Sequence, residues 1–246
     1  MFSLRKFKGK RLVAYLRQGD YSHPGESESI ELVMQFIHKK KNNKILDLGC
    51  GLGGTAYYLS QHHYGQIYGL DIETESIEYA QKKYKNVTFK CGNVVEVHKI
   101  FKGIKFDVFV LFNSFYAFSD QATALKSLHQ CAKTHSKLLI FDYSINDCNK
   151  TYQWITPSSF IPVVMPKIAS ILKATQWRLI KKKDITAKYC RWYDDLCRKL
   201  EKNKTYIVKE FGEAAFTEAL RLYSKILNDL SKKNLGGCII YAKYEH

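Results

Sequence analysis

The chain has 246 residues, of which 46% are hydrophobic and 25% charged, and its formal net charge is +16. This composition predicts one globular domain with a sizeable core and excludes a disordered or collagen-like chain. No apolar run approaches the roughly 18–20 residues of a membrane span, and the basic N-terminus lacks the apolar stretch of a signal peptide. The seven cysteines include no C-x-x-C pair, so we expect reduced thiols, a cytoplasmic location and no metal site.

The excess positive charge lies in the two flanks. Residues 1–43 hold 9 basic and 4 acidic residues, residues 44–150 hold 12 and 10, and residues 151–246 hold 18 and 9. This distribution marks either an anionic partner, such as nucleic acid, a membrane surface or a phosphorylated substrate, or a lysine-rich composition without a partner. We favour the second explanation because the lysines are scattered rather than arranged in a stripe.

Strand and helix signals alternate from residue 44 onward. Five apolar or alternating segments predict strands, at 44–50, 66–72, 87–93, 106–112 and 137–144. Three segments between them predict helices, at 55–63, 74–85 and 120–133. The alternation predicts an α/β fold with a Rossmann-like, doubly wound and mostly parallel sheet.

The C-terminal third differs from the middle. Residues 151–165, with Trp154 and Phe160, predict a loop or broken helix, and Pro166 begins a helix to about Gln176. The remaining predicted elements are a strand at 178–186, helices across about 187–233 and a last strand at 238–243. We therefore expect a single domain, with an N-terminal helical cap segment (1–43), a seven-stranded core (44–186 and 237–246) and a helical lid inserted between the last two strands (187–236).

The segment ILDLGCGLGGT, residues 45–55, carries the sharpest signal. Gly49, Gly51 and Gly53 allow the backbone to turn tightly and approach a ligand, and the following helix offers free N–H groups. About 20 residues later, Asp71 ends the second predicted strand, where a carboxylate can accept hydrogen bonds from both ribose hydroxyls. Together they predict an adenosine-containing cofactor at the carboxyl ends of the strands.

The spacing D-x-G-x-G-x-G that starts at Asp47 resembles motif I of the class I S-adenosylmethionine-dependent methyltransferases. The resemblance covers about residues 44–145 and implies S-adenosyl-L-methionine as the cofactor. It implies that Asp47 acts through water or the loop backbone, that Asn93 and Val94 contact the adenine, and that Asn113 lines the methionine end. The implied cofactor-binding residues are Tyr21, Ser22, His23, Asp47, Gly49, Gly51, Gly53, Asp71, Ile72, Asn93, Val94 and Asn113.

The flanking segments resemble those of small-molecule methyltransferases. RQGDYSHPGE (17–26) is similar to a segment that folds over the cofactor, although a turn with locally satisfied polar groups is an equal alternative. DYS (142–144), DIT (184–186) and the terminal GGCIIYAK resemble the phosphoethanolamine, sarcosine-forming, sterol and quinone methyltransferases. The closest likeness is to the phosphoethanolamine N-methyltransferases, in which a helical insertion closes over the substrate.

One departure concerns the catalytic base. Phosphoethanolamine enzymes use a Tyr–His pair with the His just after the fourth strand, where this chain has Ala117 and Phe118. His129 lies too far along the chain to replace it, and the N-terminal Tyr has no secure match. The base is therefore unidentified, and the candidates are His23, Tyr116, Tyr143, Tyr189 and Asp194.

Aromatic residues offer candidate contacts to the substrate. The set is Tyr116, Tyr189, Trp192 and Tyr193. Their rings could hold a methylammonium group by cation–π attraction, or they could be plain core. Because a sulfonium is a good leaving group, the enzyme's main tasks would be to align an in-line displacement and to exclude water.

The predicted function is methyl transfer to a small-molecule acceptor, which could be an amine, a phosphobase, a lipid or a quinone-like compound. One alternative is an RNA methyltransferase, motivated by the charge but opposed by the lack of an accessory RNA-binding module. Another is a non-catalytic cofactor-binding protein, opposed by the intact Gly49, Gly51 and Asp71. We expect no nucleic-acid partner and no transmembrane segment, while peripheral membrane contact and the oligomeric state stay open.

Overall fold

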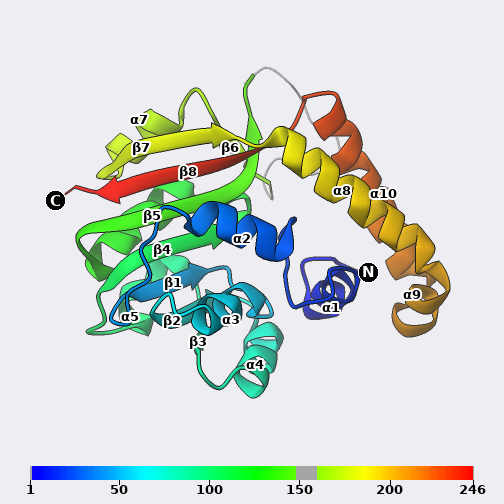
Figure 1. The fold of residues 1–246 in the computed structure, drawn as a ribbon, viewed down its shortest axis with the longest axis horizontal. Helices are drawn as coiled ribbons and strands as arrows, with labels where there is room; N and C mark the ends of the chain where they lie inside the picture. Colours follow the sequence, from blue (N-terminus) through cyan, green and yellow to red (C-terminus); the bar gives the residue numbers. More distant parts are fainter. Residues whose placement is uncertain (1, 148–159, 246) are drawn as a thin grey trace.

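The computed structural model describes residues 2–147 and 160–245, which form one mixed α/β sheet with flanking helices (Figure 1). The sheet order is β3-β2-β1-β4-β5-β8-β7, and β6 pairs with the end of β5. The strands are β1 (Lys44–Leu48), β2 (Gln66–Asp71), β3 (Thr88–Cys91), β4 (Phe106–Phe112), β5 (Ala132–Ile145), β6 (Val163–Val164), β7 (Trp177–Asp184) and β8 (Gly236–Tyr244). β8 runs antiparallel to both of its neighbours, β5 and β7. The Rossmann-like prediction is confirmed, with β6 as an eighth strand beyond the seven expected.

The helices precede, separate and follow these strands. They are α1 (Phe7–Leu16), α2 (Glu26–Met34), α3 (Gly54–Gln61), α4 (Thr74–Lys83), α5 (Val97–Ile100), α6 (Gln121–Ser127), α7 (Ile168–Ala174), α8 (Thr186–Lys202), α9 (Lys204–Phe211) and α10 (Glu213–Ser231). Short 3-10 turns occur at Val94–Glu96, Phe115–Ala117 and Leu128–Cys131. None of these helices is long and apolar enough to cross a membrane.

The central strands are apolar on both sides because helices cover both faces of the sheet. Along β4, Val108 and Val110 join one buried cluster, with residues of α2, α3 and α4. Phe109 and Leu111 point the other way, into a second cluster with residues of α5, α6 and α7. This two-sided burial explains why the sequence of β4 is almost continuously apolar.

Two predicted boundaries were wrong. The helix expected over 120–133 ends at Ser127, and Ala132 and Lys133 already belong to β5. The Ser136 hydroxyl donates to the Phe106 carbonyl at 2.7 Å, which joins this polar stretch to β4. Thr186 starts α8 instead of ending a strand, since its N–H donates to Asp184 Oδ1 at 2.8 Å. Of the loop or broken helix predicted over 151–165, Trp154 and the other residues up to 159 lie outside the described residues, whereas Val163–Val164 form the short strand β6.

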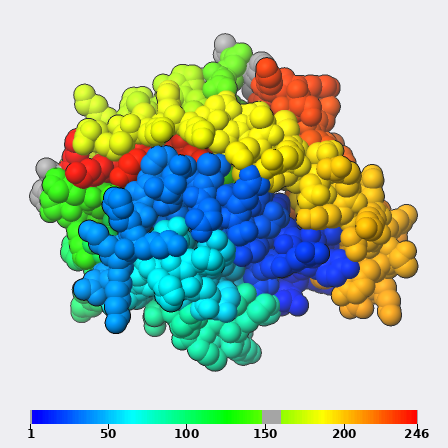
Figure 2. Space-filling model, in the orientation of Figure 1, coloured from blue at the N-terminus to red at the C-terminus, as the bar shows by residue number. Residues whose placement is uncertain are grey.

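The helices α8–α10 lie between β7 and β8 along the chain, at the end of the sheet where the parallel strands finish (Figure 1). The N-terminal helix α1 contacts both α8 and α9. Figure 2 shows α2 and α8 meeting in one continuous surface on the face in view. The carboxyl ends of the strands are therefore enclosed by the two flanks of the sequence.

Candidate active site

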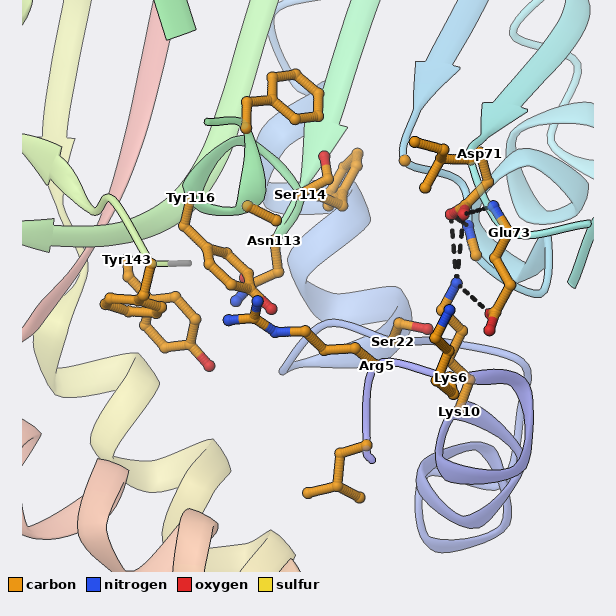
Figure 3. Close-up of a pocket in the computed structure, with 18 of the residues that line it drawn as sticks. Arg5, Lys6, Lys10, Ser22, Asp71, Glu73, Asn113, Ser114, Tyr116 and Tyr143 are labelled. Atoms are coloured by element: carbon orange, nitrogen blue, oxygen red, sulfur yellow. Dashed lines mark hydrogen bonds and ion pairs between the residues drawn. The ribbon is translucent and has the colours of Figure 1, made fainter. Parts of the chain in front are cut away.

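A cavity of about 490 Å³ lies beyond the carboxyl ends of the parallel strands (Figure 3). Its polar half is lined by residues of the loops after β1, β2 and β3, including Gly49, Gly51, Asp71, Glu73 and Asn93. Its aromatic half is lined by Tyr116, Tyr143, Phe160, Tyr193 and Tyr223. Arg5, Lys10 and Arg17 of the N-terminal segment line it as well. The volume falls within the ~300–1,000 Å³ typical of small-molecule sites.

Two glycines of the loop after β1 are required for different structural reasons. Gly51 lines the cavity with a φ of +55°, and a Cβ there would lie 3.0 Å from Ser22 Oγ. Gly53, with a φ of +87°, makes room for the Phe89 ring, 2.7 Å from where its Cβ would be. The absence of a Cβ at Gly51 thus lets Ser22 approach the loop at the cavity wall, while Gly53 allows close packing behind the loop.

Asp71 lies at the end of β2 and faces the cavity. Its Oδ2 accepts a hydrogen bond from the Gly51 N–H at 2.7 Å, and its Oδ1 accepts one from the Glu73 N–H at 2.9 Å. The Lys10 ammonium lies 3.4 Å from both carboxylate oxygens and 3.0 Å from Glu73 Oε2 (Figure 3). The carboxylate is thus fixed by the backbone and presents its remaining lone pairs to a cationic or hydroxyl donor.

Asp47 lies behind the glycine loop and does not line the cavity. Its side chain is buried, and Oδ2 has no hydrogen-bond partner among the described residues. Burial, together with the nearby Asp71 charge, raises the pKa of Asp47 to about 8. Asp47 therefore acts on a ligand only indirectly, through the loop.

The loops after β2, β3 and β4 complete the polar half. Ile72, Asn93 and Val94 line the cavity, and Asn93 Oδ1 accepts a hydrogen bond from the Val95 N–H at 3.2 Å. Asn113 lines the cavity with a left-handed φ of +50°. Its Oδ1 accepts a hydrogen bond from the Tyr189 hydroxyl at 2.6 Å. Tyr189 itself does not line the cavity, so it orients Asn113 from behind.

Of the three N-terminal residues expected to contact the cofactor, only one lies at the cavity. Ser22 lines the cavity, whereas Tyr21 and His23 do not. His23 is buried, with Nε2 at 2.8 Å from Thr55 Oγ1, and burial lowers its pKa to about 3. The prediction that His23 serves as a base in contact with substrate was wrong, because its ring packs in the core against Phe112 and Phe141.

Because of the helical periodicity, neighbouring aromatic residues of α8 face different surroundings. Tyr193 lines the cavity, but Trp192 packs on Gly25 and donates from Nε1 to Glu28 Oε2 at 2.9 Å. Asp194 is exposed and pairs with Arg198 at 3.0 Å, so its selection as a base was also wrong. The His129 ring forms a hydrogen bond with the Thr175 carbonyl oxygen.

Phenols and a buried carboxylate surround the aromatic half. The hydroxyls of Tyr143 and Tyr193 are hydrogen-bonded to each other, and burial raises the pKa of both. Burial also raises the pKa of Asp142 to about 7, and its oxygens accept from the N–H groups of Tyr116 and Tyr143. Within residues 2–147 and 160–245 no histidine lines the cavity. The described walls are therefore suited to an acceptor that needs no strong base.

Several lining residues were missed by the sequence reasoning. They are Arg5, Lys10, Arg17, Glu73, Phe160 and Tyr223. A signal existed for Arg17, since it is the first residue of RQGDYSHPGE, and for Glu73, which follows Asp71 by two positions. The others depend on how the flanks fold back over the sheet.

Comparisons with known proteins agree with this geometry. A family model described as "Methyltransferase domain" matches residues 39–239. Phosphoethanolamine N-methyltransferase of Plasmodium falciparum is 20% identical over 235 residues, which cover 92% of this chain and 88% of the relative. Phosphoethanolamine N-methyltransferase 1 of Zea mays is 23% identical over 222 residues, but the match covers 87% of this chain and only 44% of the relative. The chain thus spans less than half of that plant protein.

Solved structures show the same fold. Phosphoethanolamine N-methyltransferase 2 of Haemonchus contortus, in complex with phosphomonomethylethanolamine and S-adenosylhomocysteine, has a TM-score of 0.84 at 17% identity. That match covers 100% of this chain and 61% of the other. The cyclopropane synthase MmaA2 of Mycobacterium tuberculosis also has a TM-score of 0.84, at 13% identity, with 98% and 96% covered.

Proposed function

The chain belongs to the methyltransferase domain family, and from that premise we propose that it transfers a methyl group from S-adenosyl-L-methionine to a small-molecule acceptor. The observation that carries the proposal is the continuity of the cavity. One cavity joins the glycine loop and Asp71 to an aromatic chamber under α8 and α10. Donor and acceptor can therefore meet in one enclosed space.

The residues of the polar half fit the cofactor. Asp71 would receive the ribose hydroxyls, Asn93 and Val94 the adenine, and Gly51 and Asn113 the methionine portion. When bound, S-adenosyl-L-methionine supplies a methyl group on a good leaving group. The position of these residues along one wall of the cavity and the left-handed backbone of Gly51 at that wall support this assignment.

The aromatic half would align the acceptor and exclude water. Tyr143 and Tyr193 form one wall, and Tyr116 and Phe160 are within ring contact of Tyr143. We take residues 187–236 as a lid and residues 1–43 as a cap on a single catalytic domain, with α1 and Ser22 contributing to the cavity wall from the cap. Closure favours an in-line displacement because it holds the reactants dry and aligned.

A small-molecule acceptor is favoured over RNA because the cavity, of about 490 Å³, has the size of a small-molecule site and is lined by residues of α1, α8 and α10 as well as of the sheet. The phosphoethanolamine relatives support a small acceptor, but Phe118 follows β4 where those enzymes are expected to have a His, so we do not transfer their substrate. We also propose a cytoplasmic location, supported by the free thiols of the six described cysteines.

The experiment compares two glycines with left-handed backbones. Gly51→Ala places a methyl at the cavity wall, whereas Gly103→Ala, at a φ of +77°, meets nothing within 4 Å. Both substitutions strain a left-handed backbone, and Gly51→Ala should lose more stability because its Cβ would also lie 3.0 Å from Ser22 Oγ. Only Gly51→Ala should weaken the binding of S-adenosylhomocysteine in calorimetry, because only Gly51 lines the cavity. We expect a loss of at least tenfold, in line with the ~1–3 kcal/mol cost of overpacking. Equal affinities in the two variants would show that the cofactor does not bind at this loop.

A further inference from the structure

Arg17 is a buried cation in the wall of the cavity. Its side chain is 3% exposed, and NH1 donates to Glu26 Oε1 at 2.8 Å. Its Nε has no hydrogen-bond partner in the described chain, although Arg17 lines the cavity. A buried guanidinium with one partly exposed carboxylate partner and an unpaired, inaccessible Nε is incompletely neutralised, so an anion in the adjoining cavity would stabilise its charge. This combination indicates a site for a ligand anion.

The surroundings of Arg17 also favour an anion. Its charge interacts with the phenols of Tyr193 on α8 and Tyr223 on α10, and both line the cavity. Among the described lining carboxylates, Asp71 and Glu73 already contact Lys10 in the polar half, and Asp120 is exposed. A cation placed beside Arg17 would be repelled, whereas an anion would gain the guanidinium and two hydroxyl donors.

A second arginine, Arg5, lines the cavity beside Tyr116. Arg5 reaches from the N-terminal segment to Tyr116, with Cζ 5.4 Å from the ring centroid (Figure 3). Arg5 is exposed, whereas Arg17 is buried. An entering anion would therefore meet a positive charge first at the solvent-accessible side and then in the depth of the wall.

Apolar side chains supply much of the remaining wall of the aromatic half, as far as the structure describes it. The side chains that supply this surface are Val13, Phe112, Phe118, Phe160, Leu222 and Ile226. A ligand that fills this space needs an apolar body, because polar groups facing these side chains would lose their hydration. The walls thus match a molecule with one anionic end and an apolar remainder.

We propose that the methyl acceptor is an amphipathic organic anion, a carboxylate or phosphate monoester on an apolar body, anchored by Arg17 with Tyr193 and Tyr223. This inference rests on the proposed function. It replaces the expectation that the aromatic rings hold a methylammonium group. Glu26, whose side chain is 28% exposed, neutralises part of the Arg17 charge, so it should weaken the binding of the acceptor.

The test measures probe binding to protein saturated with S-adenosylhomocysteine. The anionic probes are 4-hydroxybenzoate and phenyl phosphate, the neutral probe is 4-hydroxybenzyl alcohol and the cationic probe is tyramine. We expect at least one anion to bind at least tenfold more tightly than the neutral and cationic probes, about 1.4 kcal/mol. Comparing the two anions distinguishes a carboxylate site from a phosphate site.

Three variants separate an anion anchor from a structural ion pair. Arg17→Met should reduce anion affinity to that of the neutral probe, and Arg17→Lys should retain part of it. Glu26→Gln should strengthen anion binding by a few-fold, because it frees the guanidinium charge. Arg11→Met, at an arginine of α1 that lines no part of this cavity, should leave anion affinity unchanged.

Thermal melting of each variant shows whether it is folded. The proposal is overturned if no probe anion binds preferentially to wild type, or if Arg17→Lys and Glu26→Gln both bind anions as wild type does. It is also overturned if Glu26→Gln weakens anion binding as much as Arg17→Met does. That result would mean that the Arg17–Glu26 ion pair only maintains the structure of the site. Failure of wild type to bind S-adenosylhomocysteine at all would instead overturn the proposed function.

Discussion

Two buried aspartates near the site differ in how well their carboxylates are hydrogen-bonded. Asp142 accepts hydrogen bonds from the N–H groups of Tyr116 and Tyr143, and so joins the loop after β4 to the end of β5. Asp47 has an unpartnered Oδ2 and lies near Asp71, and these conditions disfavour its ionised form. Burial disfavours the ionised form of both carboxylates, but hydrogen bonds from the backbone offset part of that cost for Asp142, while the Asp71 charge adds to it for Asp47.

The raised pKa of Asp47 predicts a dependence of stability on pH. Its pKa is about 8 in the folded protein, against roughly 4 in an unfolded chain. The folded state therefore binds the proton more tightly, so this contribution is present at low pH and is lost as the pH rises from about 4 to about 8. The loss is on the order of 1 kcal/mol per pH unit across that window.

Denaturant unfolding of ligand-free wild type and Asp47→Asn at pH 5, 7 and 9 measures this effect. The variant cannot ionise at this position, so its stability relative to wild type should increase with pH. Asp142, whose pKa is also raised, contributes equally to both proteins and cancels in the difference. A difference that stays constant with pH would contradict the assignment.

Spacing along the chain pointed to cavity-lining residues of the polar half, but it could not sort the aromatic residues. Gly51 and Asp71 were found because a strand end fixes their position within a few residues. Trp192 and Tyr193 are adjacent, so composition could not tell which one faces the cavity; that depends on the rotation of α8 against the sheet. The sequence made His23 a candidate base, but in the fold its ring contacts core residues of β4 and β5.

At the scale of elements, most of the sheet could be predicted because its strands are short apolar runs bounded by turn residues. The insertion between the last two strands was predicted from its amphipathic stripe, and α8–α10 occupy it. The docking position of α1 could not be predicted from its sequence. That position depends on long-range contacts with α8 and α9 and on the ion pairs of Lys10 with Asp71 and Glu73.

The docking of α1 predicts competition at Asp71. The Lys10 ammonium faces the carboxylate lone pairs that ribose hydroxyls would need. Lys10→Met should therefore raise the affinity for S-adenosylhomocysteine by about two- to fivefold, in line with the ~0.2–1 kcal/mol of a partly exposed ion pair. Calorimetry on this variant and on Lys8→Met, at an exposed position of the same helix, measures the change. A fall in affinity for Lys10→Met alone would show that α1 holds the cofactor in place.

For the whole molecule, the charge of +16 and the enclosed cavity point to different partners. Some of the basic charge lies far from the site: Lys137, on β5, has its pKa lowered by burial and by Lys40 and Lys243. The arginines of the cavity carry only a small share of the total. A nonspecific attraction to polyanions is therefore compatible with a small-molecule site, provided that the two can be separated experimentally.

Salt dependence separates them. An RNA site that neutralises six or more phosphates would lose roughly a thousandfold or more in affinity between 50 and 200 mM salt. We expect structured RNA to bind weakly at 200 mM salt and to leave S-adenosylhomocysteine affinity unchanged, because the cavity is roofed by α1, α8 and α10. The matched variant is Lys137→Gln with Lys243→Gln, which should reduce RNA binding at low salt without altering cofactor affinity. Tight RNA binding that persists at 200 mM salt and is abolished by Arg17→Met would place RNA in the cavity itself and reverse the preference for a small acceptor.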